Sequence, residues 1–209
     1  MYDIFEGTAE IQHLVIAKAI GGSVMSVKRD TLAFKVPGKV LGTRVLGQEV
    51  AAQLRKRAGD GQQDLLVDFA GVQVASSPFL DELARTLRAW NVDHPDHFVV
   101  LMNLNEDVQD TLELVLERRD MALAEMTKGT LRLIGGKAHL QETLNAAQEL
   151  KVFTAAELAA QLELKLPNLH QRLVALEAAG ALVRVRPAGA PQRPVVFQTP
   201  QPVELAACS

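Results

Sequence analysis

The stretch from residue 64 to residue 90 constrains the fold more than any other part of the chain. It begins with the apolar run Leu65 to Val67, whose bulk is typical of a strand buried in a sheet. After a brief extended piece come two serines and a proline, residues 76–78, which favour the start of a helix. Apolar residues then recur at helical spacing as far as Trp90. The sequence therefore predicts a buried strand, a turn and a helix whose amino end carries two serines.

Strands and helices alternate on both sides of this stretch. Apolar runs with strand character alternate with amphipathic segments that have capping residues at their starts. The expected strands lie within residues 24–36, 64–69, 97–103, 121–126 and 130–134, and the expected helices within 43–59, 77–90 and 105–119. Such alternation is typical of the α/β class, in which helices pack against a sheet.

Helical patterns dominate after His139, and two short apolar runs follow them. Helices are expected within 139–150, 154–162 and 167–179, the second with a capping box formed by Thr154 and Glu157. Strands are expected at 182–185 and 195–198, joined by a loop rich in proline and glycine. Three helices followed by a hairpin is the order of a winged helix-turn-helix domain.

The strand and helix around residue 77 resemble a STAS-like domain family, similar to the STAS domains of anti-sigma-factor antagonists. Residues of both elements carry the resemblance: Asp68, Phe69, Val72, Ser77, Phe79, Asp81 and Glu82. Ala75 and Pro78 depart from the antagonists, which have aspartate and glycine at these positions. The resemblance implies a mixed sheet with helices and a protein partner, such as an ATPase or kinase-like protein.

Ser76 and Ser77 have two interpretations. As helix caps they need only accept a hydrogen bond from a free backbone N–H. The resemblance to the antagonists implies a second role for Ser77, because in that family the second serine of the turn is phosphorylated and the added charge breaks partner binding. A phosphate at the amino end of a helix is electrostatically favourable. The sequence leaves both interpretations open.

The segment 153–186 closely resembles the winged helix-turn-helix domains of bacterial regulators. In that family the third helix enters the major groove of DNA, and its early exposed positions meet the bases. The resemblance implies DNA contacts from the third helix and the wing: Asn168, His170, Gln171, Arg172, Arg184, Arg186 and Arg193.

The charge of this segment limits how strongly a single copy would hold DNA. Residues 149–209 carry six lysines and arginines against five glutamates, a net charge of +1, whereas strong nonspecific binding neutralises many phosphates. We therefore expect a homodimer or a partner protein. Because winged helices also serve as protein-binding modules, a protein–protein adaptor remains the alternative to a DNA-binding regulator.

Residues 1–20 resemble the C-terminal tail segment of acyl-CoA dehydrogenases. The matching residues are Phe5, Glu6, Gly7, Thr8, Ile11 and Gln12. The resemblance implies a catalytic base at Glu6 and a flavin neighbour at Gln12, but a lone carboxylate without a flavin or acyl site cannot run that reaction. We expect an amphipathic helix with a flexible joint at residues 21–23, whether native, fused or engineered, and an acyl-CoA dehydrogenase fragment is the remote alternative.

Composition and the remaining motifs set the other expectations. The net charge of −3 argues against a protein wholly coated with nucleic acid. Cys208 is the only cysteine, so no intramolecular disulfide can form and a reducing cytoplasm is expected. No apolar run approaches the ~20 residues of a membrane span. His94 and His97 lack further metal ligands, and residues 135–137 lack the spacing of a phosphate-binding loop. We expect no cofactor, metal, membrane partner or enzymatic activity.

These features predict four regions. They are an N-terminal helix and joint at 1–23, a STAS-like domain at 24–137, a winged helix-turn-helix domain at 138–199 and a disordered tail at 200–209. The predicted function is non-enzymatic transcriptional regulation in the cytoplasm, with a protein partner on the first domain and DNA on the second.

Overall fold

The computed structural model describes residues 31–59, 64–185 and 195–200. These residues belong to one compact unit, which begins at Thr31. The predicted N-terminal helix with Glu6 and Gln12, the joint at residues 21–23 and nearly all of the predicted tail lie outside the described residues.

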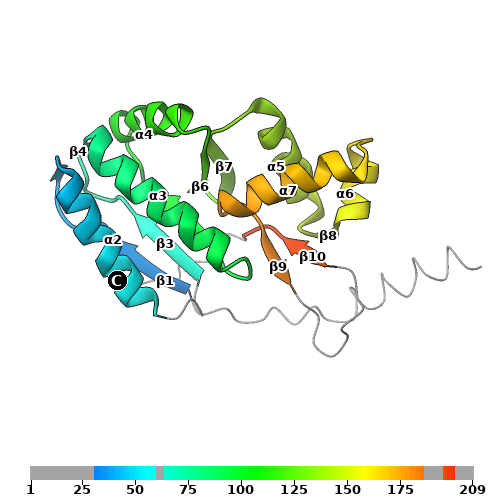
Figure 1. The fold of residues 1–209 in the computed structure, drawn as a ribbon, viewed down its shortest axis with the longest axis horizontal. Helices are drawn as coiled ribbons and strands as arrows, with labels where there is room; N and C mark the ends of the chain where they lie inside the picture. The colour runs from blue at the N-terminus through cyan, green and yellow to red at the C-terminus, as the bar shows by residue number, and fades with distance from the viewer. Residues whose placement is uncertain (1–30, 60–63, 186–194, 201–209) are drawn as a thin grey trace, which may run out of the picture. The chain divides into compact units, whose positions relative to one another are not determined.

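A five-stranded sheet with the strand order β1-β3-β5-β6-β7 lies at the centre of this unit (Figure 1). The first four strands are parallel: β1 (Thr31–Lys35), β3 (Asp64–Asp68), β5 (Val99–Met102) and β6 (Ala122–Thr127). β7 (Thr130–Gly135) returns antiparallel to β6 through Lys128 and Gly129, which both have positive φ, as a two-residue hairpin turn requires. The α/β class expected from the sequence is confirmed.

Three helices cover one face of this sheet. They are α2 (Arg44–Ala58), α3 (Ser77–Asp93) and α4 (Glu106–Arg118), and each follows one parallel strand and precedes the next. Because the strand order advances in one direction and such crossovers are right-handed, the connecting helices belong on the same face. Their apolar residues form the first core with the side chains of Leu65, Val67, Val99 and Leu101.

The predicted helix starts are confirmed. Thr43, Ser76 and Asn105 each accept a hydrogen bond from the backbone N–H three residues further on, and Thr154 forms the capping box with Glu157. A short parallel pair, β2 (Val40–Leu41) with β4 (Val74–Ala75), precedes α2 and α3 and joins their amino ends.

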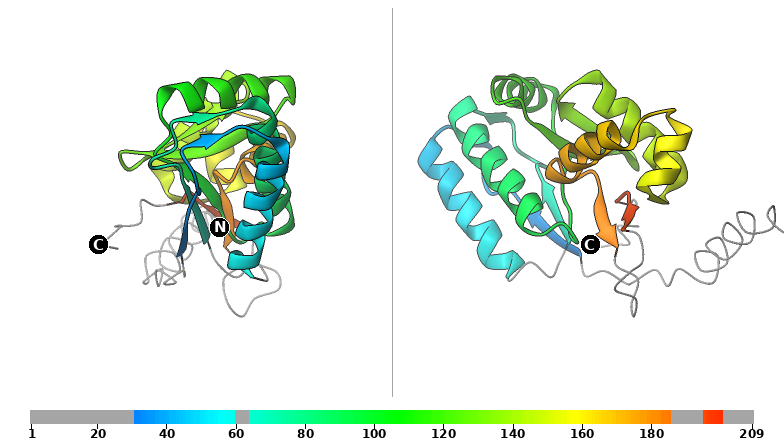
Figure 2. Two further views of the ribbon diagram at one scale, coloured as in Figure 1. Left: turned by 90° about the vertical axis from the view of Figure 1, so that its left-hand side faces the viewer. Right: turned by 45° about the vertical axis from the view of Figure 1, so that its right-hand side comes forward.

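The C-terminal part of the chain covers the opposite face of the sheet (Figure 2). It consists of α5 (Ala138–Leu150), α6 (Ala155–Gln161), α7 (Leu166–Ala178) and an antiparallel sheet of β8 (Val152–Thr154), β10 (Val196–Gln198) and β9 (Val183–Val185), in that order. Its apolar residues form the second core with Leu66, Val100 and Ala124 of the central sheet and with Phe98 just before β5. The described residues of the ranges 24–137 and 138–199 therefore pack on opposite faces of one sheet, each with a core of its own.

The two parts are in close contact at Gly180, two residues after the end of α7. This residue has a φ of +78°, and a Cβ atom there would overlap the carbonyl oxygen of Val99. The buried side chain of Asn91 lies beside it, accepts a hydrogen bond from the Val99 N–H (3.0 Å) and donates one to the Ala178 carbonyl (3.3 Å). One amide thus joins α3, β5 and the end of α7.

Gly180→Ala should lower the free energy of unfolding by about 3 kcal/mol or more, because backbone strain and overlap act together. Gly71→Ala is the matched control. Gly71 also has a positive φ, +91°, but a Cβ there would meet nothing within 4 Å, so only strain of about 1 kcal/mol is expected. Urea unfolding followed by the fluorescence of Trp90, the only tryptophan, measures both. Equal losses would contradict the close contact at Gly180.

Candidate functional site

α7 has one buried and one exposed face. Its leucines at positions 169, 173 and 176 are buried in the second core, whereas Asn168, His170 and Gln171 are exposed. Within the described part of the chain, none of these three side chains is engaged in a hydrogen bond or ion pair. The structure therefore leaves three of the predicted DNA-contacting side chains available to a ligand.

Two of the predicted DNA-contacting arginines make internal bonds instead. Arg172 donates from one terminal nitrogen to the backbone oxygen of His139 (3.3 Å) and to Oγ1 of Thr143 (3.0 Å), both on α5. Arg184 forms a two-pronged ion pair with the buried Glu177 (Nη2 to Oε2, 2.8 Å). Hydrogen bonding to Glu177 raises the pKa of Arg184. A buried carboxylate needs such a partner, so Arg184 is held within the fold.

The other two arginines of the predicted wing, Arg186 and Arg193, lie outside the described residues.

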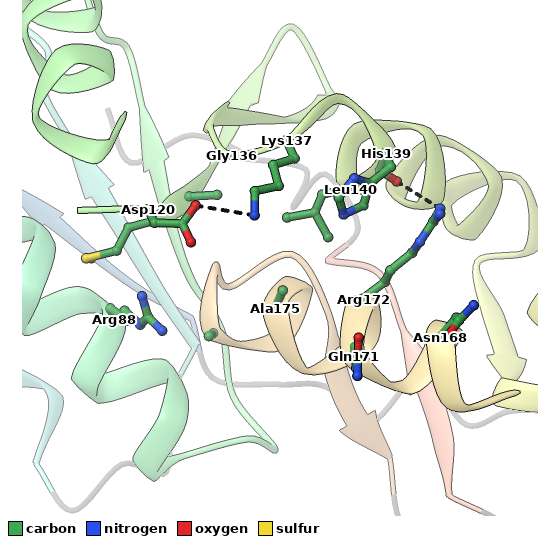
Figure 3. Close-up of a pocket in the computed structure, with 13 residues that line it drawn as sticks. Arg88, Asp120, Gly136, Lys137, His139, Leu140, Asn168, Gln171, Arg172 and Ala175 are labelled. Carbon is green, nitrogen blue, oxygen red and sulfur yellow. Dashed lines mark hydrogen bonds and ion pairs between the residues drawn. The ribbon is translucent and has the colours of Figure 1, made fainter. Parts of the chain in front are cut away.

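A hollow of about 360 Å³ opens beside the exposed face of α7 (Figure 3). It lies between α3, α7, the start of α5 and the adjoining ends of β6 and β7. Polar side chains from all these directions line it: Arg88, Asp120, Lys137, His139, Asn168, Gln171 and Arg172.

The charges around this hollow do not balance. Arg88, Lys137 and Arg172 are cationic, and Asp120 is the single carboxylate among the lining residues. Asp120 Oδ1 lies 3.8 Å from Lys137 Nζ, with both side chains largely exposed, and ion pairs of this kind are weak. No sequence motif could reveal the cluster, because its charged residues are distributed between positions 88 and 172.

Ser76 has the capping role that the sequence predicted. Its Oγ accepts a hydrogen bond from the Phe79 N–H (3.4 Å) and donates one to the carbonyl of Gly42 (2.9 Å), just before α2. Ser77 is the first residue of α3, is half-buried, and its side chain makes no hydrogen bond within the described part of the chain. Its phosphorylation stays a prediction.

Asp81, in the next turn of α3, binds cations from two other helices. Arg119, just after α4, donates to both carboxylate oxygens at 2.7 Å, and Arg44 of α2 lies 3.6 Å away. The hydrogen bonds from Arg119 lower the pKa of Asp81 against the raising effect of its burial, and the positive charges of Arg119, Arg44 and Arg85 lower it further. The carboxylate thus ties the three helices of the first core together.

The histidines before β5 have structural partners. Nδ1 of His97 lies 3.3 Å from the carboxylate of the buried Asp64, and the ring of His94 stacks on Trp90. Within the described ranges, no group of three or more histidine, cysteine, aspartate or glutamate side chains is placed to hold a metal ion.

Comparisons with known proteins identify no family for this chain. No protein-family model matches the sequence, and no curated protein matches it. Among the described residues, no helix combines the length and the apolar character needed to cross a membrane.

Ser76→Ala should lower the free energy of unfolding by about 1 kcal/mol, because α3 loses its cap. Ser77→Ala, one residue further on, removes no side-chain hydrogen bond and should cost about 0.5 kcal/mol or less. Chemical denaturation of the two variants tests this assignment, which fails if Ser77→Ala is the more costly change.

Arg119→Gln should lower the urea midpoint at neutral pH but not in acid. Because the pKa of Asp81 is lowered in the folded state, the contribution of the pair is present above the unfolded value of about 4 and is lost as the pH falls through the folded value. The difference between wild type and variant should therefore shrink from about pH 7 to about pH 3. A difference that stays constant over this range would show that Asp81 does not titrate against Arg119.

Proposed function

We propose that this chain is a non-enzymatic regulator with a protein-binding STAS-like part and a DNA-binding winged helix. The winged helix is formed by α5 to β10 and contacts DNA through the exposed side chains of α7. This exposed, polar face of α7 is the observation that carries the proposal.

The order of elements supports the winged helix. A helix, a strand, two helices and two further strands follow one another from α5 to β10, and the three strands form one antiparallel sheet. In such domains the third helix is the recognition helix. α7 takes this position and presents Asn168, His170 and Gln171, residue types that form hydrogen bonds with base edges or phosphates.

An exposed apolar pair supports a protein partner near the start of α3. Val40 and Val74 lie opposite each other in the β2–β4 pair and are 66% and 51% exposed. They adjoin the turn that holds Ser76 and Ser77. Exposed apolar side chains gathered at one place are typical of protein-binding surfaces.

Few cations are available for DNA. Arg184 is neutralised by Glu177, and Arg172 is tied to α5. Because phosphate contacts supply most of the nonspecific affinity, the proposal includes a homodimer that presents two α7 faces at once.

A protein–protein adaptor is the second candidate. On α7, Leu166 and Val174 are 45% and 59% exposed, and apolar side chains on the outer face of a helix favour a protein surface over a phosphate backbone.

Binding to labelled duplex DNA, measured by fluorescence anisotropy across a salt series, tests the proposal. The test variant His170→Glu/Gln171→Glu places two carboxylates on the exposed face of α7, and we expect it to weaken binding at least about tenfold through repulsion of phosphates. These exposed positions are preferable to Arg172 and Arg184, whose replacement would also disturb internal contacts.

The control variant Gln48→Glu/Gln53→Glu adds two carboxylates on the exposed side of α2 and should leave binding unchanged. An equal loss of DNA affinity in both double variants would show that the change in net charge, and not the position on α7, weakens binding. Absence of salt-sensitive binding by the wild type would overturn the DNA proposal and favour the adaptor.

A further inference from the structure

The hollow between α3, α5 and α7 concentrates positive charge that the fold itself does not neutralise. Within the described part of the chain, neither Arg88 nor Arg172 has a carboxylate at ion-pair distance. The single carboxylate of the lining, Asp120, is 80% exposed and lies 3.8 Å from Lys137. Like charges around one hollow repel one another, and a bound anion would reduce this repulsion.

Arg172 is fixed in place without being neutralised. It is half-buried, and one of its terminal nitrogens donates to two uncharged oxygens, the carbonyl of His139 and the hydroxyl of Thr143. A guanidinium has five N–H donors, so its remaining donors are open to a ligand. Figure 3 shows Arg172 reaching from α7 toward the first turn of α5, with Lys137 at the opposite side of His139 and Leu140.

We propose that this hollow binds a small phosphomonoester with a hydroxylated body, such as a sugar phosphate. Three cations against one carboxylate leave a net charge of +2. A phosphomonoester carries between −1.5 and −2 at neutral pH and matches this charge. A carboxylate or a backbone phosphodiester carries a single negative charge and would leave the site half neutralised.

The rest of the lining selects the body of the ligand. A volume of about 360 Å³ is at the lower end for small-molecule sites. Asn168, Gln171 and His139 offer donors and acceptors for hydroxyl groups. The lining contains no phenylalanine, tyrosine or tryptophan, so it offers no platform of these rings for a nucleobase to stack on. These features favour a sugar phosphate over a nucleotide.

Occupancy would join the two parts of the fold, because Arg88 belongs to an element of the first core and Arg172 to one of the second. A ligand that binds only the folded state raises its melting temperature. Asn168 and Gln171 line the hollow and also belong to the α7 face that the proposed function assigns to DNA, whereas Arg88, Lys137 and His139 belong to the hollow alone.

Titration of the full chain with ribose 5-phosphate, followed by amide NMR and thermal melting, tests the proposal. We expect saturable shifts at Gly136, Lys137 and Ala138 with a Kd below about 1 mM, and no binding of ribose itself. Arg88→Ala and Lys137→Ala should each weaken binding about tenfold, whereas Asp120→Asn should strengthen it. Lys39→Ala, which removes an exposed cation far along the chain from the hollow, should change nothing.

Three outcomes would overturn the proposal. The first is no saturation at about 10 mM ligand, where even a millimolar site is mostly filled. The second is ligand binding that survives in the double variant Arg88→Ala/Lys137→Ala. The third is loss of DNA binding in that double variant when the wild type binds no phosphomonoester. The last outcome would assign the hollow to the DNA backbone. Failure of DNA binding alone leaves the expected phosphomonoester results unchanged and overturns only the proposed function.

Discussion

A parallel sheet whose strand order advances in one direction collects its connecting helices on one face and leaves the other face apolar. Leu65 and Val67 of β3 point into the core beneath α2 to α4, whereas Leu66 between them points to the opposite side. The C-terminal helices cover that second face, and the backbone N–H of Ala124 on β6 donates to the carbonyl of Ala179 beyond α7 (2.8 Å). The C-terminal part is therefore a layer of the fold.

This arrangement determines which side chains remain for function. Glu177 and Arg184 are occupied with each other, and Asn91 with the backbone at both sides of the junction. The polar outer face of α7 and the cationic hollow beside it remain accessible to a ligand. The hollow is lined by residues of both layers, Arg88 of α3 and Arg172 of α7 among them.

The sequence predicted local structure well because short-range chemistry decides it. Capping residues placed the starts of α2, α3 and α4, and Lys128–Gly129 placed the β6–β7 turn. The continuous run Leu65 to Val67 correctly indicated a strand buried on both faces. The element that covers the second face depends on contacts between residues far apart in sequence. The short strands β2 and β8, of two and three residues, also carry too little periodicity to be recognised.

The candidate site was predictable only in part for the same reason. The resemblance to winged helix-turn-helix domains implied that Asn168, His170 and Gln171 are exposed positions of the third helix, and they are exposed in the structure. An arginine in a sequence does not indicate which group it will bind. The ion pair of Arg184 with Glu177 and the hydrogen bonds of Arg172 to α5 could therefore be recognised only from the three-dimensional structure. The cations of the hollow also come from separate parts of the chain: Arg88 from α3, Lys137 from the loop before α5, and Arg172 from α7.

Native-state hydrogen exchange across a urea series tests whether the two layers, which pack on the same sheet, unfold as one unit. The amides of Leu66 and Val100 report on the central sheet, and those of Leu173 and Leu176 on α7. Because both layers pack on the same sheet, we expect their opening free energies to decrease together and converge on the free energy of global unfolding. Opening of α7 at much lower urea, with the sheet still protected, would show that the C-terminal part unfolds as an independent domain and that the two layers are not one unit.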